Sequence, residues 1–300
     1  MEKIGSRINK YLSEIGHCSR READVLIAQG RVRINGRVPE PGTRVQKKDE
    51  VIVDGLRVSD DIEPDVYLAF HKPEGIVSTT DPAEKSNIIK YLMYPRRIFP
   101  IGRLDKMSEG LILLTSDGDI VNKILRAHNN HEKEYEVSVN RKINPRFIEQ
   151  MSGGLPIMGT MTKKCKVEAT GPKSFKITLT QGLNRQIRRM CEYLDYEVVT
   201  LKRTRIMNIS LDMPVGDWRD LTESELSEIM KLVEHSSKTQ KKSSSQSPKK
   251  KSGSKPKHKS FSEFKRSEAE KKRKNKNHGK RNVRPAKPNR NSSKGRRGSR

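Results

Sequence analysis

The chain has 300 residues and a formal charge of +26, and most of this charge lies near its C-terminal end. Residues 236–300 hold 25 Lys and Arg against 3 acidic residues, which leaves 38 against 34 in residues 1–235. The first 235 residues have an ordinary globular composition. The remainder has too few apolar residues to bury a core, so we expect a disordered basic tail that binds polyanions, above all nucleic acid.

The cysteines and the hydropathy of the chain exclude several classes of protein. Cys18, Cys165 and Cys191 follow no pairing pattern, and no CxxC or HxxxH spacing occurs, so we expect no zinc site. We find no signal peptide, no lipidation motif and no apolar stretch long enough to cross a bilayer. These features predict a cytoplasmic protein that does not bind membranes.

Two helices are predicted near the start of the chain. Apolar residues recur at helical spacing over residues 8–15. Ser19 and Glu22 have the spacing of a capping box for a second helix, which Gly30 can end.

Short strands should follow these helices. Residues 31–38 alternate polar and apolar side chains around Asn35-Gly36, which predicts a β-hairpin, and residues 51–53 predict a further strand. Residues 6–55 therefore read as a small α+β module. Basic residues lie in or beside its helices, which by composition alone is equally well explained as a solvated face. They are Arg7, Lys10, Arg20 and Arg21.

This module resembles the S4 RNA-binding domain. The matching features are Asn-Lys-Tyr-Leu at residues 9–12, Ser-Arg-Arg-Glu-Ala-Asp at 19–24 and Gly-x-Val-x-Ile-Asn-Gly at 30–36. The resemblance implies an S4 domain over residues 6–58. Its basic helical residues, the four just named, would then contact the RNA backbone and position the RNA rather than read its sequence.

A second domain is expected over residues 66–235. Strands are predicted at 66–70, 111–114, 135–139 and 175–179, and helices at 119–126, 145–152, 186–194 and 223–234. Strands and helices do not alternate regularly. The prediction for the whole chain is therefore α+β, with this domain built on a mixed, mostly antiparallel sheet.

Three segments of this domain hold more charge or more polar groups than packing requires. Residues 101–111 place Arg103-Leu104-Asp105 directly before a buried strand, where a surface turn capped by the aspartate is the ordinary explanation. Tyr135 has the spacing of an inward-facing strand residue, so core packing is the default for it. Residues 181–190 place arginines at the start of a helix, where cations oppose the helix dipole, so an anionic group should lie nearby.

The same segments resemble the motifs of the pseudouridine synthases. Residues 102–111 match the pattern Gly-Arg-Leu-Asp-x-x-Ser-x-Gly-Leu residue for residue. The resemblance implies that Asp105 is the nucleophile, that Tyr135 stacks on the target base and transfers a proton, and that Arg188 pairs with Asp105. It places Ile187 on the floor of the uracil pocket. The other motif residues expected to contact RNA are Arg103, Leu104, Lys106, Arg185, Gln186 and Arg189.

The N-terminal module and the segment after the third motif resemble the small-subunit-type branch of that family. This resemblance implies a monomer that isomerises uridines of 23S rRNA, with a tRNA as a second candidate substrate, and needs no cofactor or metal. A non-catalytic S4-type RNA-binding or ribosome-assembly protein is the alternative. An RNA methyltransferase would need a Gly-rich cofactor loop, and a glycosidase-type hydrolase a second carboxylate; neither is evident in the sequence.

Overall fold

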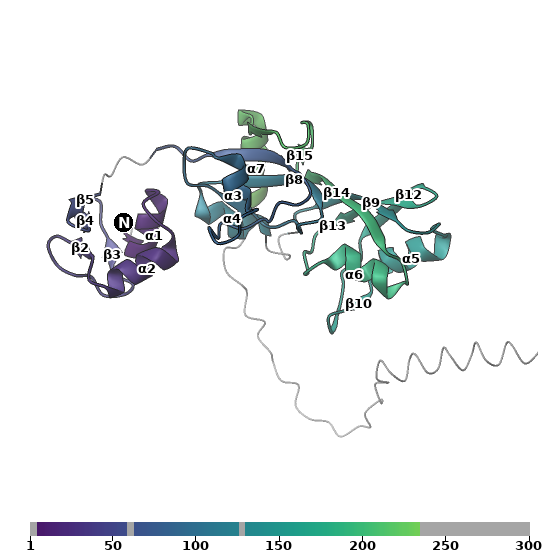
Figure 1. The fold of residues 1–300 in the computed structure, drawn as a ribbon, viewed down its shortest axis with the longest axis horizontal. Coiled ribbons are helices and arrows are strands. Elements are labelled where there is room, and N and C mark those ends of the chain that lie inside the picture. Colours follow the sequence, from purple (N-terminus) through teal and green to yellow (C-terminus); the bar gives the residue numbers. More distant parts are fainter. Residues whose placement is uncertain (1–4, 59–62, 126–129, 235–300) are drawn as a thin grey trace, which may run out of the picture. The chain divides into compact units, whose positions relative to one another are not determined.

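The structure is a computed structural model, and it describes residues 5–58, 63–125 and 130–234 (Figure 1). The expected basic tail, residues 236–300, lies outside these ranges. Within them, no helix has the length and the apolar character needed to cross a membrane. The N-terminal module and the larger sheet domain are described in turn.

The N-terminal module has the predicted helices. Its elements are β1 (Ser6–Arg7), α1 (Ile8–Glu14), α2 (Arg20–Ala28), β2 (Val32–Ile34), β3 (Arg44–Val45), β4 (Val51–Val53) and β5 (Leu56–Arg57). The capping box at the start of α2 is confirmed: Ser19 Oγ accepts a hydrogen bond from the Glu22 N–H (3.1 Å), and Glu22 Oε2 accepts one from the Ser19 N–H (2.7 Å). The apolar faces of both helices pack on β2 and β4 to form the core of the module.

The hairpin expected over residues 31–38 is only partly formed. Asn35 and Gly36 both have positive φ and make the expected tight turn, but Ile34 pairs with Arg37 in a single bridge. Strand β2 instead pairs along its whole length with β4, in an antiparallel arrangement. Pro39 and Pro41 have no backbone N–H to donate, so the chain after Arg37 cannot continue as a paired strand.

The larger domain is built on one nine-stranded sheet, in the order β12-β13-β9-β14-β8-β6-β16, with β15 beside β14 and β7 beside β8. Every pairing is antiparallel except that between β14 and β8, so the prediction of a mixed, mostly antiparallel sheet is confirmed. Its strands are β6 (Tyr67–Lys72), β7 (Phe99–Ile101), β8 (Glu109–Thr115), β9 (Lys133–Val139), β12 (Lys166–Gly171), β13 (Ser174–Leu179), β14 (Val198–Ile206), β15 (Ile209–Ser210) and β16 (Trp218–Asp220). A separate hairpin joins β10 (Pro156–Ile157) to β11 (Thr160–Met161).

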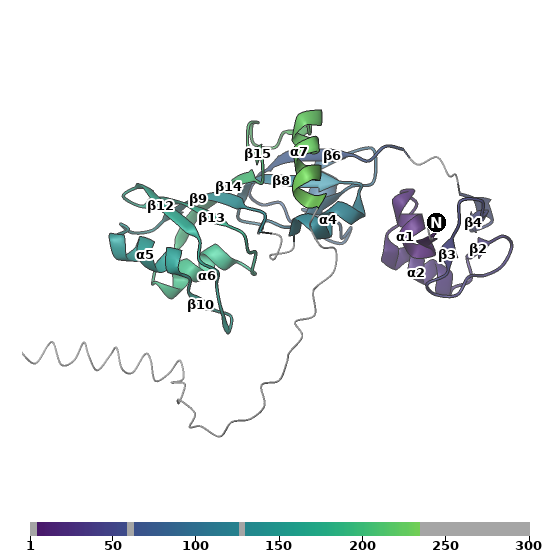
Figure 2. The ribbon, with the colours of Figure 1, turned by 180° about the vertical axis from the view of Figure 1, so that it is seen from behind.

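Helices cover parts of both faces of this sheet (Figures 1 and 2). They are α3 (Ile88–Leu92), α4 (Gly118–Leu125), α5 (Pro145–Gly153), α6 (Gln186–Tyr193) and α7 (Glu223–Glu234). Helices α5 and α6 pack on β9 and β13 in what we call the α5/α6 core, and α3 packs on β6 and β8 in the α3 core. Helices α4 and α7 pack on the other face of β6 and β8.

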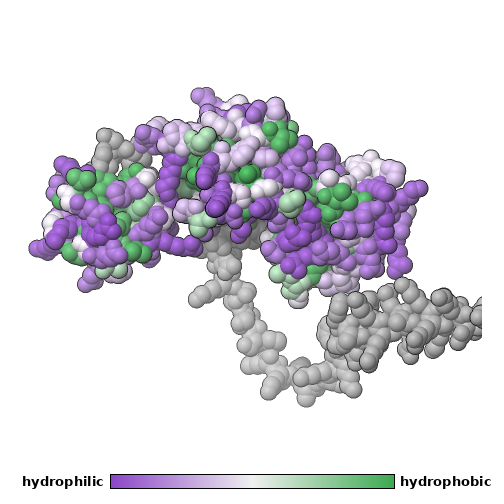
Figure 3. Space-filling view, in the orientation of Figure 1, coloured by the Kyte–Doolittle hydropathy of each residue, from purple (hydrophilic) through white to green (hydrophobic). Residues whose placement is uncertain are grey.

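Apolar side chains are concentrated in these cores. In the view of Figure 3, hydrophilic residues cover most of the described surface, and apolar residues gather only in small groups.

Glu225 at the start of α7 is expected to contribute stability that depends on pH. Its carboxylate accepts hydrogen bonds from Arg219 (2.8 Å) and from the Thr222 N–H (2.8 Å). The Arg219 hydrogen bond is the main reason that the pKa of Glu225 is lowered from 4.5 to about 2. Because the folded-state pKa is the lower one, this stability is present above about pH 4.5 and is lost as the pH falls toward 2.

Replacing Glu225 with Gln should therefore lower the free energy of unfolding at pH 7 by about 1–3 kcal/mol, since Gln keeps the helix cap but not the charge. At pH 3 the difference between wild type and variant should be much smaller. Urea unfolding of both proteins at the two pH values measures it, and an equal difference at both would show that the charge is not the cause.

Candidate active site

Asp105 lies on the loop that joins β7 to β8, and hydrogen bonds fix this loop on both sides of the carboxylate. The buried Ser78 Oγ accepts a hydrogen bond from the Leu104 N–H (3.1 Å) and donates one to the Leu104 carbonyl (3.0 Å). The Gly75 N–H donates to the Lys106 carbonyl (2.7 Å). With its backbone held in this way, the Asp105 side chain stays at the surface of the domain, 35% exposed.

The expected ion pair between Arg188 and Asp105 is not formed. The Arg188 side chain is buried, and its guanidinium donates to the carbonyls of Met107 (2.7 Å) and Val198 (3.2 Å). Arg185 takes the expected place instead, with its Nη1 3.8 Å from Asp105 Oδ2. The reason is local: Arg188 lies on the buried face of α6, whereas Arg185 precedes the helix in a left-handed conformation (φ 50°) and remains exposed.

The two arginines therefore have different parts in the site. Arg188 ties α6 to the loop that carries Asp105, and so holds the position of the carboxylate through the backbone. The contact of Arg185 with Asp105 is long and partly exposed, so its own contribution to stability is small. It can exchange this contact for one with an anionic ligand.

Tyr135 lies on β9 between Ile177 of β13 and Arg203 of β14. Its ring packs against both the α5/α6 core and the α3 core, so it lies where the two cores meet. The Arg203 guanidinium carbon lies 6.0 Å from the centre of the ring. Tyr135 is half-buried. Packing on two sides fixes the ring, as a stacking residue requires.

The other motif residues divide into exposed and buried groups. Arg103 and Lys106 are exposed, and Arg189 is half-buried and held by Asn184 through hydrogen bonds of 3.0 and 3.1 Å. Three residues expected to contact RNA are buried: Leu104 packs in the α3 core, Ile187 packs in the α5/α6 core, and the Gln186 side chain accepts a hydrogen bond from the Leu183 N–H. All three are only 5–6% exposed.

Arg7, Arg20 and Arg21 of the N-terminal module are exposed. Lys10 is less so, and it forms an ion pair with Glu14 one helical turn further on (3.0 Å). Three of the four residues expected to contact the RNA backbone therefore present their charge to solvent.

Three cations near Tyr135 were not among the residues expected from the sequence. Lys72 is fully buried at the end of β6, Arg203 is 3% exposed, and Lys133 starts the strand that carries Tyr135. Burial, together with the nearby charge of Arg203, lowers the pKa of Lys72 and that of Lys133 to about 8. No signal in the sequence would have found Arg203, because no strand was predicted over the residues of β14 that carry it.

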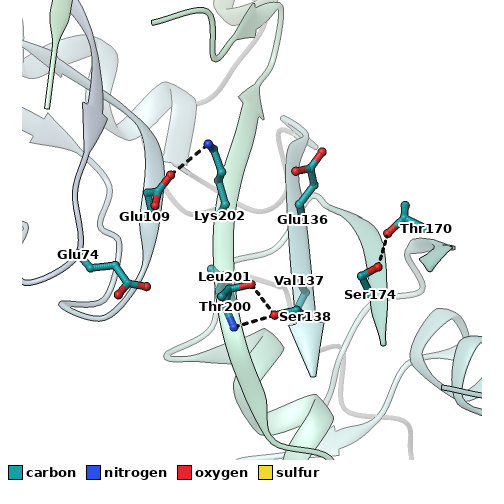
Figure 4. A pocket seen from close by; sticks show the side chains of 10 residues that line it. All are labelled: Glu74, Glu109, Glu136, Val137, Ser138, Thr170, Ser174, Thr200, Leu201 and Lys202. Carbon is teal, nitrogen blue, oxygen red and sulfur yellow. Dashed lines mark hydrogen bonds and ion pairs between the residues drawn. The ribbon is translucent and has the colours of Figure 1, made fainter. Parts of the chain in front are cut away.

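A cavity of about 450 Å³ is lined by other residues (Figure 4). Glu136 and Ser138 line it and alternate with Tyr135 along β9, so this part of the cavity is on the opposite face of the sheet. Glu74 and Glu109 also line it, and Glu109 pairs with Lys202 (3.1 Å). Its charge is net negative, which does not suit an RNA backbone. Among the described residues, no group of three or more His, Cys, Asp or Glu side chains is placed to hold a metal ion.

Known proteins match both the N-terminal module and the sheet domain. The sequence profile of the S4 domain matches residues 6–51, and that of RNA pseudouridylate synthase matches residues 66–193. The dual-specificity RNA pseudouridine synthase RluF of Salmonella typhi is 56% identical over 241 residues, which are 79% of this chain and 82% of that protein. The chain belongs to the RNA pseudouridylate synthase family. Its resemblance to this family, inferred from the motifs, is confirmed.

More distant members of the family also match this RNA pseudouridine synthase. The ribosomal large subunit pseudouridine synthase B of Bacillus subtilis (strain 168) is 33% identical over 239 residues, covering 76% of this chain and 97% of that protein. A crystal structure of a pseudouridylate synthase superposes with a TM-score of 0.55 at 29% identity, covering 75% of this chain and 99% of the other. The synthase is thus an isomerase with an S4 RNA-binding domain.

Proposed function

We propose that this synthase converts specific uridines of 23S rRNA, and of a tRNA, into pseudouridine, with Asp105 as the nucleophile. The observation that carries the assignment of Asp105 is its position on a loop held by Ser78, Gly75 and Arg188, with its carboxylate partly exposed. The rRNA and tRNA substrates are suggested by the similarity to proteins named dual-specificity synthases. We further propose that the synthase acts as a monomer in the cytoplasm.

The reaction is an intramolecular transfer, and each proposed residue has one part in it. The bond between N1 of uracil and C1′ of ribose breaks, the base rotates, and C5 bonds to C1′. C5 loses a proton and N1 gains one, so atoms and electrons balance without a co-reactant. Asp105 supplies the carboxylate, Tyr135 stacks on the base and moves a proton, and Arg185 holds the RNA near Asp105.

The target must leave its helix before these groups can reach it. Flipping a base out of a duplex costs a few kcal/mol, and contacts with the RNA backbone offset this cost. Arg103, Lys106 and Arg189 beside the site, and Arg7, Arg20 and Arg21 of the S4 domain, are the cations proposed for those contacts.

Mapping pseudouridines in rRNA and tRNA from cells with and without this gene tests the proposal. We expect at least one 23S rRNA position and one tRNA position to lose the modification and to regain it when the wild-type gene is restored. Identical maps from the two strains would contradict the proposed substrates.

Removal of residues 236–300 should leave the chemistry intact and weaken RNA binding at low salt. This segment has 25 cationic residues and few apolar ones, so its contribution should be electrostatic and independent of sequence. Each phosphate neutralised adds about 0.7–0.9 to the slope of log affinity against log salt. The truncated synthase should show a shallower slope and modify the same uridines. Equal slopes would mean that the tail does not touch the RNA.

A further inference from the structure

Arg203 has a place in the site that its contacts with the protein do not explain. It is 3% exposed, and strand register puts it in one row with Tyr135 on β9 and Gly110 on β8. Gly110 pairs in turn with Lys72 on β6. Side chains of directly paired residues lie on the same face of a sheet. Arg203 therefore shares a face with Tyr135 and Lys72.

The Arg203 guanidinium is held at one side only. Its Nε donates a 2.6 Å hydrogen bond to the Leu111 carbonyl, while its Nη2 is buried and has no hydrogen-bond partner among the described residues. Gly110 allows β14 to lie this close to β8, because a Cβ at residue 110 would clash with the Arg203 backbone. A buried donor without a partner costs about 1–3 kcal/mol of stability. A ligand that accepts a hydrogen bond from Nη2 would offset this cost.

The electrostatic surroundings indicate the chemistry of that ligand. Burial is the main reason that the pKa values of Lys72 and Lys133 are lowered, and the charge of Arg203 lowers both as well. For Lys72, the carboxylates of Glu74, Asp105 and Glu109 act in the opposite direction. A guanidinium keeps its charge in such surroundings. The Tyr135 face of the sheet thus holds a permanent buried cation with a spare N–H, close to the groups proposed to handle the target base.

We propose that Arg203 Nη2 donates a hydrogen bond to a carbonyl oxygen of the target uracil and stabilises the negative charge that develops on the base. This inference rests on the proposed function. When the bond between N1 and C1′ breaks, its electron pair passes to the base and is shared by O2 and O4. When C5 then bonds to C1′ that pair is used, C5 releases its proton and N1 takes one up.

The assignment does not depend on where Asp105 attacks. Attack at C1′, attack at uracil C6 and elimination to a glycal all place negative charge on the carbonyl oxygens of the base. A fixed buried donor aimed at such an oxygen acts as an oxyanion hole does. Arg203 is in this account a catalytic residue, distinct from Arg188, which positions the loop.

The test is the single-turnover rate of Arg203→Met and Arg203→Lys with an RNA that the wild-type synthase modifies. Removing one such donor should slow the chemical step about 100-fold to 1,000-fold, with little change in RNA affinity. Arg203→Lys should also be slow, because an ammonium cannot hold the Leu111 carbonyl and reach the base in the same geometry. Arg203→Lys serves as the test variant if Arg203→Met does not fold.

A second substrate separates catalysis from structure. Fluorine at C5 withdraws electrons and stabilises the uracil anion. With 5-fluorouridine at the target, the Arg203 variants should therefore lose less of the wild-type rate of N1–C1′ cleavage than they lose with uridine. A residue that merely supports the fold would slow both substrates equally. Arg205→Met is the matched control: Arg205 lies on the same strand but pairs with Glu132 (2.9 Å), and its variant should keep the wild-type rate within a few-fold.

Arg203 variants that match Arg205→Met in rate, or that lose the same factor with both substrates, would overturn the proposal. Such a result would leave the proposed function standing, because the comparison uses an RNA that the wild-type protein modifies. Failure of the wild-type protein to modify any rRNA or tRNA would instead refute the proposed function.

Discussion

Replacement of Asp105 by Asn should leave a folded synthase that binds RNA and forms no measurable pseudouridine. Asn keeps the volume of the side chain, and the loop is held by backbone contacts of Leu104 and Lys106 that the substitution does not touch. The nucleophilic charge is lost, and with it the long ion pair with Arg185, which contributes little to stability. The rate should therefore fall at least about 1,000-fold while RNA affinity and melting temperature stay close to wild type.

Asp195→Asn is the control for this variant. Asp195 is exposed and left-handed (φ 64°), a conformation that Asn also adopts readily, and it follows α6 rather than the site loop. This control should keep full activity. Turnover by purified Asp105→Asn above the level of contaminating enzyme would place the nucleophile elsewhere.

Tyr135→Phe should retain RNA binding and lose most of its turnover. The phenyl ring can keep its packing against the α5/α6 core and the α3 core, so stacking on the base is preserved. The hydroxyl proposed to move a proton is gone, and such a group contributes about 100-fold to 10,000-fold. In this variant the single-turnover rate should therefore fall, while the RNA dissociation constant stays close to that of wild type.

Tyr193→Phe is a suitable control, because Tyr193 packs against the α5/α6 core without being one of the proposed site residues. It should keep the wild-type rate. A Tyr135→Phe enzyme that works as fast as Tyr193→Phe would make Tyr135 a packing residue only.

Sequence patterns predicted those features that depend on neighbours along the chain. The capping box of Ser19 and Glu22 needs only a spacing of three residues, and it is present. The Asn35-Gly36 turn formed for the same reason, but the partner of β2 proved to be a strand further along the chain. Pairing between distant strands depends on contacts that no local pattern contains.

Strand β14 shows this limit most clearly. It lies at the centre of the sheet, between β9 and β8, yet no strand was predicted there. Bulges in its pairing with β9 interrupt the alternation, and a buried position that would ordinarily hold an apolar residue holds Arg203. The feature that hid the strand is the one now proposed to act in catalysis.

Arg185, and not Arg188, lies beside Asp105, and the sequence pattern contains part of the reason. Arg188 follows Ile187 and stands three residues before Cys191, which places it on the apolar side of α6, whereas Arg185 precedes the helix. What the sequence lacked was the position of the loop that accepts the Arg188 hydrogen bonds, because that loop comes from a segment some 80 residues earlier.

The release of hydrogen from C5 tests the central claim most directly. Unmodified 23S rRNA carrying tritium at C5 of its uridines would be incubated with the purified synthase and no added cofactor. Wild-type protein should release tritium in step with the pseudouridine formed, and Asp105→Asn should release none. No release by the folded wild-type protein, or equal release by Asp105→Asn, would contradict the account.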